Sequence, residues 1–258
     1  MKQPLVIKVG GALLESVEGQ ARLFKTIDQL VAQQIHVILV HGGGCLVEEW
    51  LAQANMKSEK LEGLRVTPTQ QIDLVAGALA GAANKKLVAA AKASGVNCVG
   101  LSLTDGDMVS ADYLDSRLGQ VGHCQAKERT LLISLLAGGY TPVISSIADD
   151  GQGNLLNVNA DQGAQVIAQL LNGKLILLSD VPGVLDGDKQ LIEKLSPQDA
   201  EQLAQQGVIV GGMKVKVDTA FATAKDLGDS IVIASWKEPQ NLLALINGGT
   251  CGTLIEAP

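Results

Sequence analysis

Aromatic residues are nearly missing from this chain of 258 residues: they make up 2% of it, against 47% for hydrophobic residues as a whole. A core built from this composition has to be aliphatic and rich in alanine. The hydrophobic share is enough for one large α/β domain or two tightly joined lobes. The 29 glycines lie mostly between regular-looking segments, which indicates tight turns and close backbone approaches rather than disorder.

An excess of positive charge is missing as well. The formal net charge is −7 and the sequence pI is about 5.0. These values argue against a general binder of nucleic acids or of membrane surfaces, because such a protein would show a basic face. An acidic protein binds phosphates only through a few local lysines and backbone amides. A phosphate site in this chain would therefore consist of those groups.

Paired cysteines and long apolar runs are also lacking. The four cysteines, Cys45, Cys98, Cys124 and Cys251, form no CxxC pair, so no metal site has the spacing to support it. A disulfide framework is not expected in a chain of this size, and we expect reduced, mostly buried thiols. The opening MKQPLVIKVGG has one short apolar run followed at once by glycines. It is typical neither of a signal peptide nor of a transmembrane span, so we expect a cytoplasmic protein.

What is present is an alternation of short β-branched runs with helix-length segments. Near-continuous apolar runs predict strands buried on both faces of a parallel sheet, at residues 5–7, 37–40, 141–144, 175–178 and 231–233. Residues 56–66 and 105–121 break the alternation and are predicted to form β-hairpins or protruding loops. The whole pattern predicts an α/β sandwich with a largely parallel central sheet, and any division into lobes is placed near residues 171–173.

Helix signals fall between these strands. Thr67-Pro68-Thr69-Gln70 has the pattern of a capping box with Thr67 as the N-cap, and Ser196-Pro197 repeats its first two positions. Apolar residues that recur after Met213 predict one stripe of an amphipathic helix. A further helix-like segment spans residues 45–54.

Two glycine turns follow the first two predicted strands. KVGG at 8–11 sets one lysine beside two unshielded backbone amides, which are the donors a polyphosphate needs, although an ordinary turn fits equally well. HGGG at 41–44 precedes a helix, so a ligand can approach free amides at the positive end of its dipole. His41 is interpreted as a hydrogen-bonded strand-end residue without a catalytic role. The chain has no Walker motif, and Val47 stands at the third glycine position of a dinucleotide fingerprint.

Two polar motifs follow. In GLRVT at 63–67, Arg65 carries a rigid fork of donors suited to a carboxylate, although a surface arginine is the more common interpretation of such a loop. In NVNAD at 157–161, the two asparagines point the same way if the backbone is extended, and Asp161 falls in the first turn of the next helix. Helix capping explains this second motif equally well.

The last two motifs lie in the C-terminal third. SDVPGVLD at 179–186 ends a buried strand, where ligands bind in open α/β sheets, but a Pro-Gly turn between hairpin strands fits as well. In GGMKVK at 211–216, Lys214 and Lys216 project on opposite flanks of the apolar stripe. Only one of them should reach a given site, and the periodicity does not say which.

Taken in order, the segments VIKVGGALL, VHGGG, GLRVTP, NVNADQ, LLSDVPGVLD and GGMKVKV resemble the amino-acid kinase family, and within it the branch that acts on N-acetyl-L-glutamate. The resemblance covers nearly the whole chain. It implies a three-layer αβα sandwich with a mainly parallel central sheet and two tightly joined lobes. Residues 1–172 would bind the acyl amino acid and form the dimer, and residues 173–258 would bind ATP.

The activity implied by this resemblance is ATP-dependent phosphorylation of the side-chain carboxylate of N-acetyl-L-glutamate to N-acetylglutamyl 5-phosphate, the second step of arginine biosynthesis. Mg²⁺ would be bound through the nucleotide phosphates, with no metal ligand from the protein. Lys8 and Lys216 would neutralise charge on the transferring phosphoryl group, and Asp161 would hold both lysines in position.

The resemblance also implies two sets of binding residues. Those for the substrate would be Gly43, Gly44, Arg65, Asn157 and Asn159. Those for the nucleotide would be Gly10, Gly11, Asp180, Val181, Pro182, Gly183, Val184, Leu185, Val208, Ile209 and Val210, with Gly44 also donating its amide to a phosphate oxygen.

Two other functions are also compatible with these motifs. A sister kinase would act on N-acetyl-aminoadipate, carbamate, glutamate or aspartate, although the chain is too short for the regulatory domain common in aspartate kinases. A non-catalytic small-molecule sensor of the same fold is a second alternative, but Lys8, Asp161 and Lys216 are all present. Family members inhibited by arginine carry an additional N-terminal helix that helps to build a hexamer. Since a strand is predicted at residues 5–7, we expect an arginine-insensitive homodimer.

Overall fold

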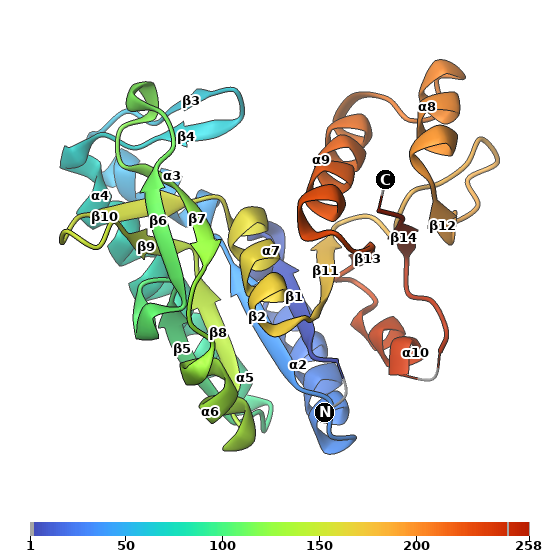
Figure 1. The fold of residues 1–258 in the computed structure, drawn as a ribbon, viewed down its shortest axis with the longest axis horizontal. Coiled ribbons are helices and arrows are strands. Elements are labelled where there is room, and N and C mark those ends of the chain that lie inside the picture. The colour runs from blue at the N-terminus through green and yellow to red at the C-terminus, as the bar shows by residue number, and fades with distance from the viewer. Residues whose placement is uncertain (1–2, 247, 258) are drawn as a thin grey trace.

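An eight-stranded sheet organises the computed structural model, which describes residues 3–246 and 248–257 (Figure 1). Its strand order is β12-β14-β13-β11-β1-β2-β8-β5. The strands are β1 (Leu5–Val9), β2 (Val37–His41), β5 (Cys98–Ser102), β8 (Thr141–Ser145), β11 (Lys174–Ser179), β12 (Lys194–Leu195), β13 (Ile231–Ser235) and β14 (Thr253–Ile255). Within the described part of the chain, only β13 and β14 pair antiparallel in this sheet. The five predicted strands and the mainly parallel sheet are confirmed.

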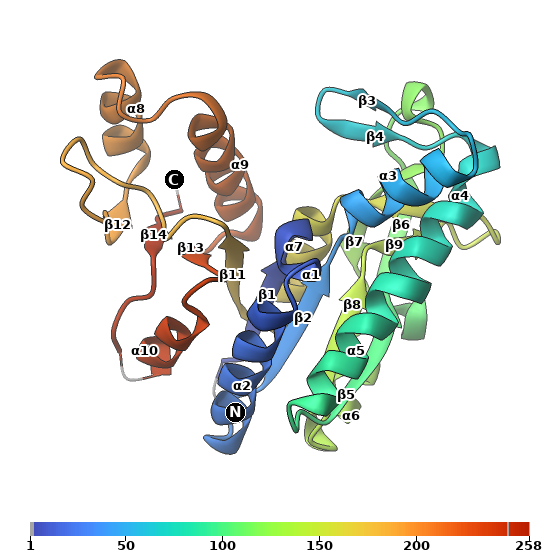
Figure 2. The same cartoon turned by 180° about the vertical axis from the view of Figure 1, so that it is seen from behind.

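Helices cover both faces of this sheet, which confirms the three-layer sandwich (Figures 1 and 2). One face carries α6 (Thr130–Ala137), α7 (Ala160–Leu171), α8 (Pro197–Gln205) and α9 (Gly211–Leu227). The other carries α2 (Val17–Ala32), α5 (Asn84–Ala93) and α10 (Leu242–Ile246), with the short η4 (Pro239–Asn241) beside it. Strands alternate their side chains between the two cores, so Ile38 faces the first and Leu39 the second. Most of the largest fully buried side chains are aliphatic, as the composition predicted, whereas Phe24 is aromatic.

A smaller sheet and a hairpin occupy the two segments that broke the alternation. β3 (Glu59–Leu61) and β4 (Leu64–Val66) form an antiparallel hairpin, which confirms that prediction for residues 56–66. β6 (Val109–Tyr113) and β7 (Val121–Ala126) are also antiparallel, but they join β10 (Leu155–Val158) and β9 (Ile147–Asp149) in a four-stranded sheet. Two short 3₁₀ turns, η2 (Asp105–Asp107) and η3 (Ser116–Leu118), flank β6.

Of the two predicted helix N-caps, one is confirmed and one is wrong. Ser196 caps α8 by accepting a hydrogen bond from the Asp199 amide at 3.2 Å, as predicted. The capping box at Thr67 is wrong, because α4 (Thr69–Ala76) has Pro68 before it and no side-chain cap. Thr67 is fully buried, its amide donates to the Leu118 carbonyl and its carbonyl accepts from Gln120. Pairing with the η3 loop has therefore taken the residue away from the helix.

One helical stretch, Thr69–Ala93, is long and apolar enough to cross a membrane by length and composition, and 39% of its most apolar window is buried. It consists of α4, the π-helix η1 (Gly77–Ala83) and α5. The α5 part packs on β5 and β8, with Leu87 and Ala91 in the core. The apolar face of α5 is thus used inside the protein.

The central strand β1 is where the strand order reverses. β2 lies on one side of it and β11 on the other, and both pair with it along its full length. The elements after Asn172 gather at one end of the molecule beside β11 (Figure 1). The sheet is therefore continuous across the point where the two lobes were predicted to divide.

The four cysteines all lie within the described residues and are free. Cys124 and Cys251 are buried, whereas Cys98 is half-buried and Cys45 is exposed. Burial raises the pKa of Cys124 to about 12 and that of Cys251 to about 11. These two thiols are therefore protonated and unreactive at neutral pH.

Candidate active site

Three turns meet at the carboxyl edge of the large sheet. They follow β1 at Gly10 and Gly11, β2 at 42–44, and β11 at 180–185. Val9 lies opposite both His41 and Leu178 in the strand register, so the three turns are neighbours. Open α/β sheets bind ligands at the carboxyl ends of their strands where the strand order reverses, and this edge is such a place.

Lys8 is held at this edge by Asp161. Its Nζ lies 3.0 Å from Asp161 Oδ1, and the two side chains are 19% and 29% exposed. Asp161 stands in the first turn of α7, where Asn159 is the N-cap and accepts from the Asp161 amide at 2.8 Å. The capping interpretation of this motif is thus confirmed, and the same turn also fixes the carboxylate that faces Lys8.

Lys216 differs from the expectation that Asp161 holds both lysines. Its Nζ lies 2.6 Å from Asp180 Oδ1, directly after β11. Because α9 packs against β13, the neighbour of β11, Lys216 reaches the end of β11 rather than that of β1. Lys214 lies on the other flank of α9, where it pairs with Asp218 at 2.7 Å. The helix geometry therefore selects Lys216 as the lysine that faces the sheet edge.

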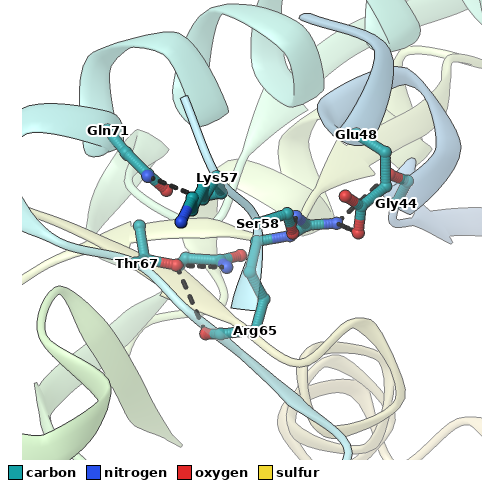
Figure 3. A network of polar contacts seen from close by, with 8 residues as sticks. Gly44, Glu48, Lys57, Ser58, Arg65, Thr67 and Gln71 are labelled. Atoms are coloured by element: carbon teal, nitrogen blue, oxygen red, sulfur yellow. Dashed lines mark hydrogen bonds and ion pairs between the residues drawn. The ribbon is translucent and has the colours of Figure 1, made fainter. Parts of the chain in front are cut away.

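Arg65 lies in a polar network with α3 (Gly44–Gln53) (Figure 3). Its Nη2 is 2.8 Å from Glu48 Oε1 and 3.2 Å from the Gly44 carbonyl, and its Nη1 donates to Ser58. The Arg65 side chain is only 10% exposed. Burial acts to raise the pKa of Glu48, but hydrogen bonds from Ser58 and Arg65 outweigh it and hold that pKa below its ordinary value. Glu48 is a partner that no local sequence pattern indicated.

A cavity of about 230 Å³ lies at this network. It is lined by all of the predicted substrate-binding residues, Gly43, Gly44, Arg65, Asn157 and Asn159, and by Asp161. Asn157 is oriented by a hydrogen bond to Thr67 Oγ1 at 3.1 Å. Lys60 of the β3–β4 hairpin also lines the cavity, and no sequence pattern indicated it because a three-residue strand has no readable periodicity.

The predicted nucleotide-binding residues have mixed surroundings. At Gly10, the described residues other than its chain neighbours place no atom within 4 Å of a Cβ position, so the backbone there is bare and open. Gly183 instead has a packing role, because a Cβ would lie 2.7 Å from Leu191 Cδ1, and Val184 donates its amide to Thr253 at 2.8 Å. Ile209 is buried in the core whereas Val210 is 57% exposed.

The remaining members of this set belong to the same region. Val208 Cγ2 lies 3.8 Å from the Cβ position of Gly187, so residues 208–210 approach the turn that follows β11. Asp180, Val181, Pro182 and Leu185 belong to that turn and are exposed or half-buried. Gly11 is close to α3, where its Cβ position is 3.4 Å from Cys45 Sγ.

The Asp180–Lys216 pair allows a test by titration. Hydrogen bonds from Lys216 and then Ser179 lower the pKa of Asp180 from 3.8 to about 2. A folded-state pKa below the unfolded value means that the pair contributes stability above about pH 4, and that this contribution is lost as the pH falls toward 2. We expect Lys216→Met to move the pKa of Asp180 back toward 3.8 in a ¹³C NMR titration of the carboxyl groups. Lys214→Met is the control and should leave it unchanged, and an unchanged value in Lys216→Met would contradict the assignment.

Comparisons with known proteins place these features in a family. Residues 3–235 match the Amino acid kinase family. The acetylglutamate kinase of Shewanella sediminis (strain HAW-EB3) is 52% identical over 255 residues, covering 99% of this chain and 97% of that protein. The acetylglutamate kinase of Shewanella amazonensis (strain ATCC BAA-1098 / SB2B) is 52% identical over 252 residues, covering 98% and 96%.

Solved structures agree on the fold. The crystal structure of smu.665 from Streptococcus mutans UA159 superposes with a TM-score of 0.81 at 30% identity and covers 100% of both chains. N-acetylglutamate synthase from Neisseria gonorrhoeae, complexed with coenzyme A and N-acetyl-glutamate, also has a TM-score of 0.81, at 24% identity over 99% of this chain and 60% of its own. The second likeness bears on the fold alone. Since the family match covers most of the chain and relatives share half of its residues over nearly its full length, the chain belongs to the amino acid kinase family.

Proposed function

We propose that this chain uses ATP to phosphorylate the side-chain carboxylate of N-acetyl-L-glutamate, which yields N-acetylglutamyl 5-phosphate for arginine biosynthesis. The observation that carries the proposal is the cavity at the carboxyl edge, where Arg65, two asparagines and glycine amides lie beside the Lys8–Asp161 pair. A guanidinium and amide groups suit a small acylated amino acid with two carboxylates. Relatives that are 52% identical over nearly the whole chain are named acetylglutamate kinase.

The chemistry of this reaction fits the groups present. A side-chain carboxylate is ionised at neutral pH and attacks phosphorus without a general base. The obstacle is repulsion between an anionic acceptor and a polyanionic donor, which fixed cations and backbone amides reduce. Lys8 and Lys216 are the two cations in this proposal, and Asp161 orients Lys8. Lys216 would exchange Asp180 for the nucleotide phosphates, since both partners of that pair are well exposed.

The nucleotide is proposed to lie over the turns after β1 and β11. The bare backbone at Gly10 and Gly11, together with the Gly44 amide at the start of α3, would donate to phosphate oxygens. Residues 180–185 and 208–210 would line the rest of the nucleotide. In this arrangement residues 1–172 would bind the acyl amino acid and supply glycine amides to the phosphates, and residues 173–258 would bind the rest of ATP.

Mg²⁺ is proposed to arrive with the nucleotide. Among the described residues, no group of three or more His, Cys, Asp or Glu side chains is placed to hold a metal ion. Asp161 and Asp180, the carboxylates at the site, are each paired with a lysine. This donor set suits phosphate oxygens, so the ion would be held through them, where it neutralises phosphate charge.

We also propose that the protein is a homodimer in the cytoplasm. β5 ends the strand order of the large sheet, and an edge strand presents backbone groups that a second chain can pair with. The partly buried helical stretch Thr69–Ala93 lies beside that edge through α5. Both features lie in residues 1–172, the part proposed to form the dimer.

Trapping of the acyl phosphate with hydroxylamine tests the function directly. The purified protein with ATP and Mg²⁺ is offered N-acetyl-L-glutamate, N-acetyl-aminoadipate, carbamate, free glutamate and free aspartate. We expect the highest kcat/KM with N-acetyl-L-glutamate. Higher kcat/KM with another acceptor would assign the chain to a sister kinase, and no turnover with any acceptor would favour a sensor.

Lys8→Ala should lower kcat by about 10²–10³-fold, as the loss of one charge-stabilising donor does elsewhere. The reason is that the Lys8 ammonium is expected to stabilise charge that develops only during transfer. Lys127→Ala is the control. Lys127 also forms an ion pair with an aspartate, Asp107, at 2.6 Å, but it does not line the cavity of the candidate site. Turnover close to wild type in Lys8→Ala would refute the role of this lysine.

Arg65→Ala should mainly raise the KM for the acyl amino acid, by about 10–100-fold for a charged hydrogen bond. The substitution also leaves Glu48 without its partner, so Glu48→Gln serves as the control. This control removes the ion pair but keeps the guanidinium, and we expect a smaller change in KM. A large loss of kcat at unchanged KM in Arg65→Ala would contradict substrate binding by this residue.

A further inference from the structure

A buried polar pair lies beneath the glycine turn that follows β2. His41 ends β2 and Asn84 begins α5, and both are 0% exposed. His41 Nδ1 lies 2.7 Å from the Gly42 carbonyl oxygen, and His41 Nε2 lies 3.0 Å from Asn84 Nδ2. Neither residue has a role in the proposed chemistry, although the turn that they support lines the cavity of the candidate site.

The partners of this pair decide where the imidazole proton lies. A carbonyl oxygen only accepts hydrogen bonds, so His41 Nδ1 has to be the donor to Gly42. The amide group of Asn84 is oriented by its other contacts. Nδ2 lies 2.8 Å from the Val143 carbonyl and 3.2 Å from the Leu101 carbonyl, and Oδ1 accepts from Lys85 Nζ at 3.2 Å. We assign the two Nδ2 hydrogens to the two shorter contacts, those with the Val143 carbonyl and His41 Nε2. Asn84 therefore turns its NH₂ group toward Nε2, which must carry a lone pair. Both ends of the ring require the same neutral tautomer.

This tautomer has a consequence for the turn. In a trans peptide the C=O and N–H groups point in opposite directions, and the Gly42–Gly43 peptide is trans. When His41 holds the Gly42 carbonyl on the buried side, the Gly43 amide is directed to the other side. Gly43 lines the cavity together with Gly44 and Arg65, so we expect its amide to face that cavity. Burial also lowers the pKa of His41 to about 4, so the ring stays neutral at neutral pH.

Asn84 directly follows a π-helix. η1 spans Gly77–Ala83 and ends directly before Asn84. π turns are rare and are found frequently at functional sites. The same segment also supports the turn, because a Cβ at Gly43 would lie 2.9 Å from Leu79 Cδ2 and 3.5 Å from Ala83 Cβ. On the other side, a Cβ at Gly100 of β5 would overlap with the Asn84 side chain, so a glycine at this position of the sheet leaves room for Asn84.

We propose that Asn84 is a positioning residue for ligand binding at the glycine turn. It selects the Nδ1–H tautomer of His41, which holds the Gly42 carbonyl and directs the Gly43 amide toward a carboxylate or phosphate oxygen of the ligand. Asn84 acts through His41 and does not touch the ligand itself. This inference rests on the proposed function, because it takes the turn to be part of the kinase site.

Long-range ¹H–¹⁵N correlation spectra read the tautomer directly. The chain has three histidines, His36, His41 and His123, so the ring signals can be assigned by substituting His36 and His123. We expect the wild-type His41 ring to be neutral with its proton on Nδ1. Asn84→Asp sets an acceptor against Nε2, so the ring should become protonated there. A wild-type ring with its only proton on Nε2 would overturn the proposal.

Kinetics of the same variants test the effect on the site. We expect Asn84→Asp to raise the KM for the acyl amino acid or for ATP, or to lower kcat, by about tenfold, as the loss of one well-placed hydrogen bond does. In a His41→Ala background, adding the Asn84→Asp substitution should have little further effect, since Asn84 acts through His41. Leu136→Ala is the matched control for stability, because Leu136 is buried in α6 near the opposite end of the sheet. It should lower Tm while leaving the His41 spectrum and KM unchanged.

Two kinetic outcomes would overturn the proposal. In the first, Asn84→Asp lowers Tm as Leu136→Ala does but keeps the wild-type KM and kcat. In the second, the changes in KM or kcat caused by the Asn84 and His41 substitutions are additive in the double variant. Failure of the proposed function looks different. In that case the wild-type protein turns over none of the acceptors. The positioning role is then still tested by the His41 tautomer and by the affinity for ATP, which calorimetry compares between wild type and Asn84→Asp.

Discussion

The parallel pairing of β1 with β2 and β11 is the constraint on which the rest of this protein depends. Parallel strands bring their carboxyl ends to one edge, and the register of these three strands sets Val9 beside His41 and Leu178. Turns that are far apart in the chain therefore become neighbours. The buried faces of the strands keep this register, since a one-residue slip would turn core side chains toward the opposite layer.

Charge at this edge is arranged locally in a protein that is acidic as a whole. Each candidate lysine has a carboxylate partner, Asp161 for Lys8 and Asp180 for Lys216, and Arg65 has Glu48. The cations are therefore held in place before any ligand binds, and little reorganisation is needed when an anion arrives. Of these pairs, the one with Asp180 is the most exposed, which suits a lysine that changes partners.

The glycine turns owe their shape to what lies beneath them. A glycine backbone is flexible by itself, so a turn that has to present amide groups in fixed directions needs support from elsewhere. For the turn after β2 that support comes from His41 and Asn84, which are buried, and from the buried residues Leu79 and Ala83 of the π-helix. Close contact between Gly43 and Leu79 shows why a side chain at that glycine would disturb the arrangement.

The amino-acid sequence was enough to predict the five strands of the main sheet, the β3–β4 hairpin, the Ser196 cap and the amphipathic stripe of α9. Each of these depends on periodicity or on hydrogen bonds within a few residues. The resemblance to a kinase family added the set of residues that line the cavity, and their roles there stay predictions. Three contacts became visible only in the folded protein: Thr67 pairs with the η3 loop instead of capping α4, Lys216 contacts Asp180, and Asn84 contacts His41. The partners of these contacts are 36 or more positions apart in the chain, and packing of whole elements, which no local pattern encodes, brings them together.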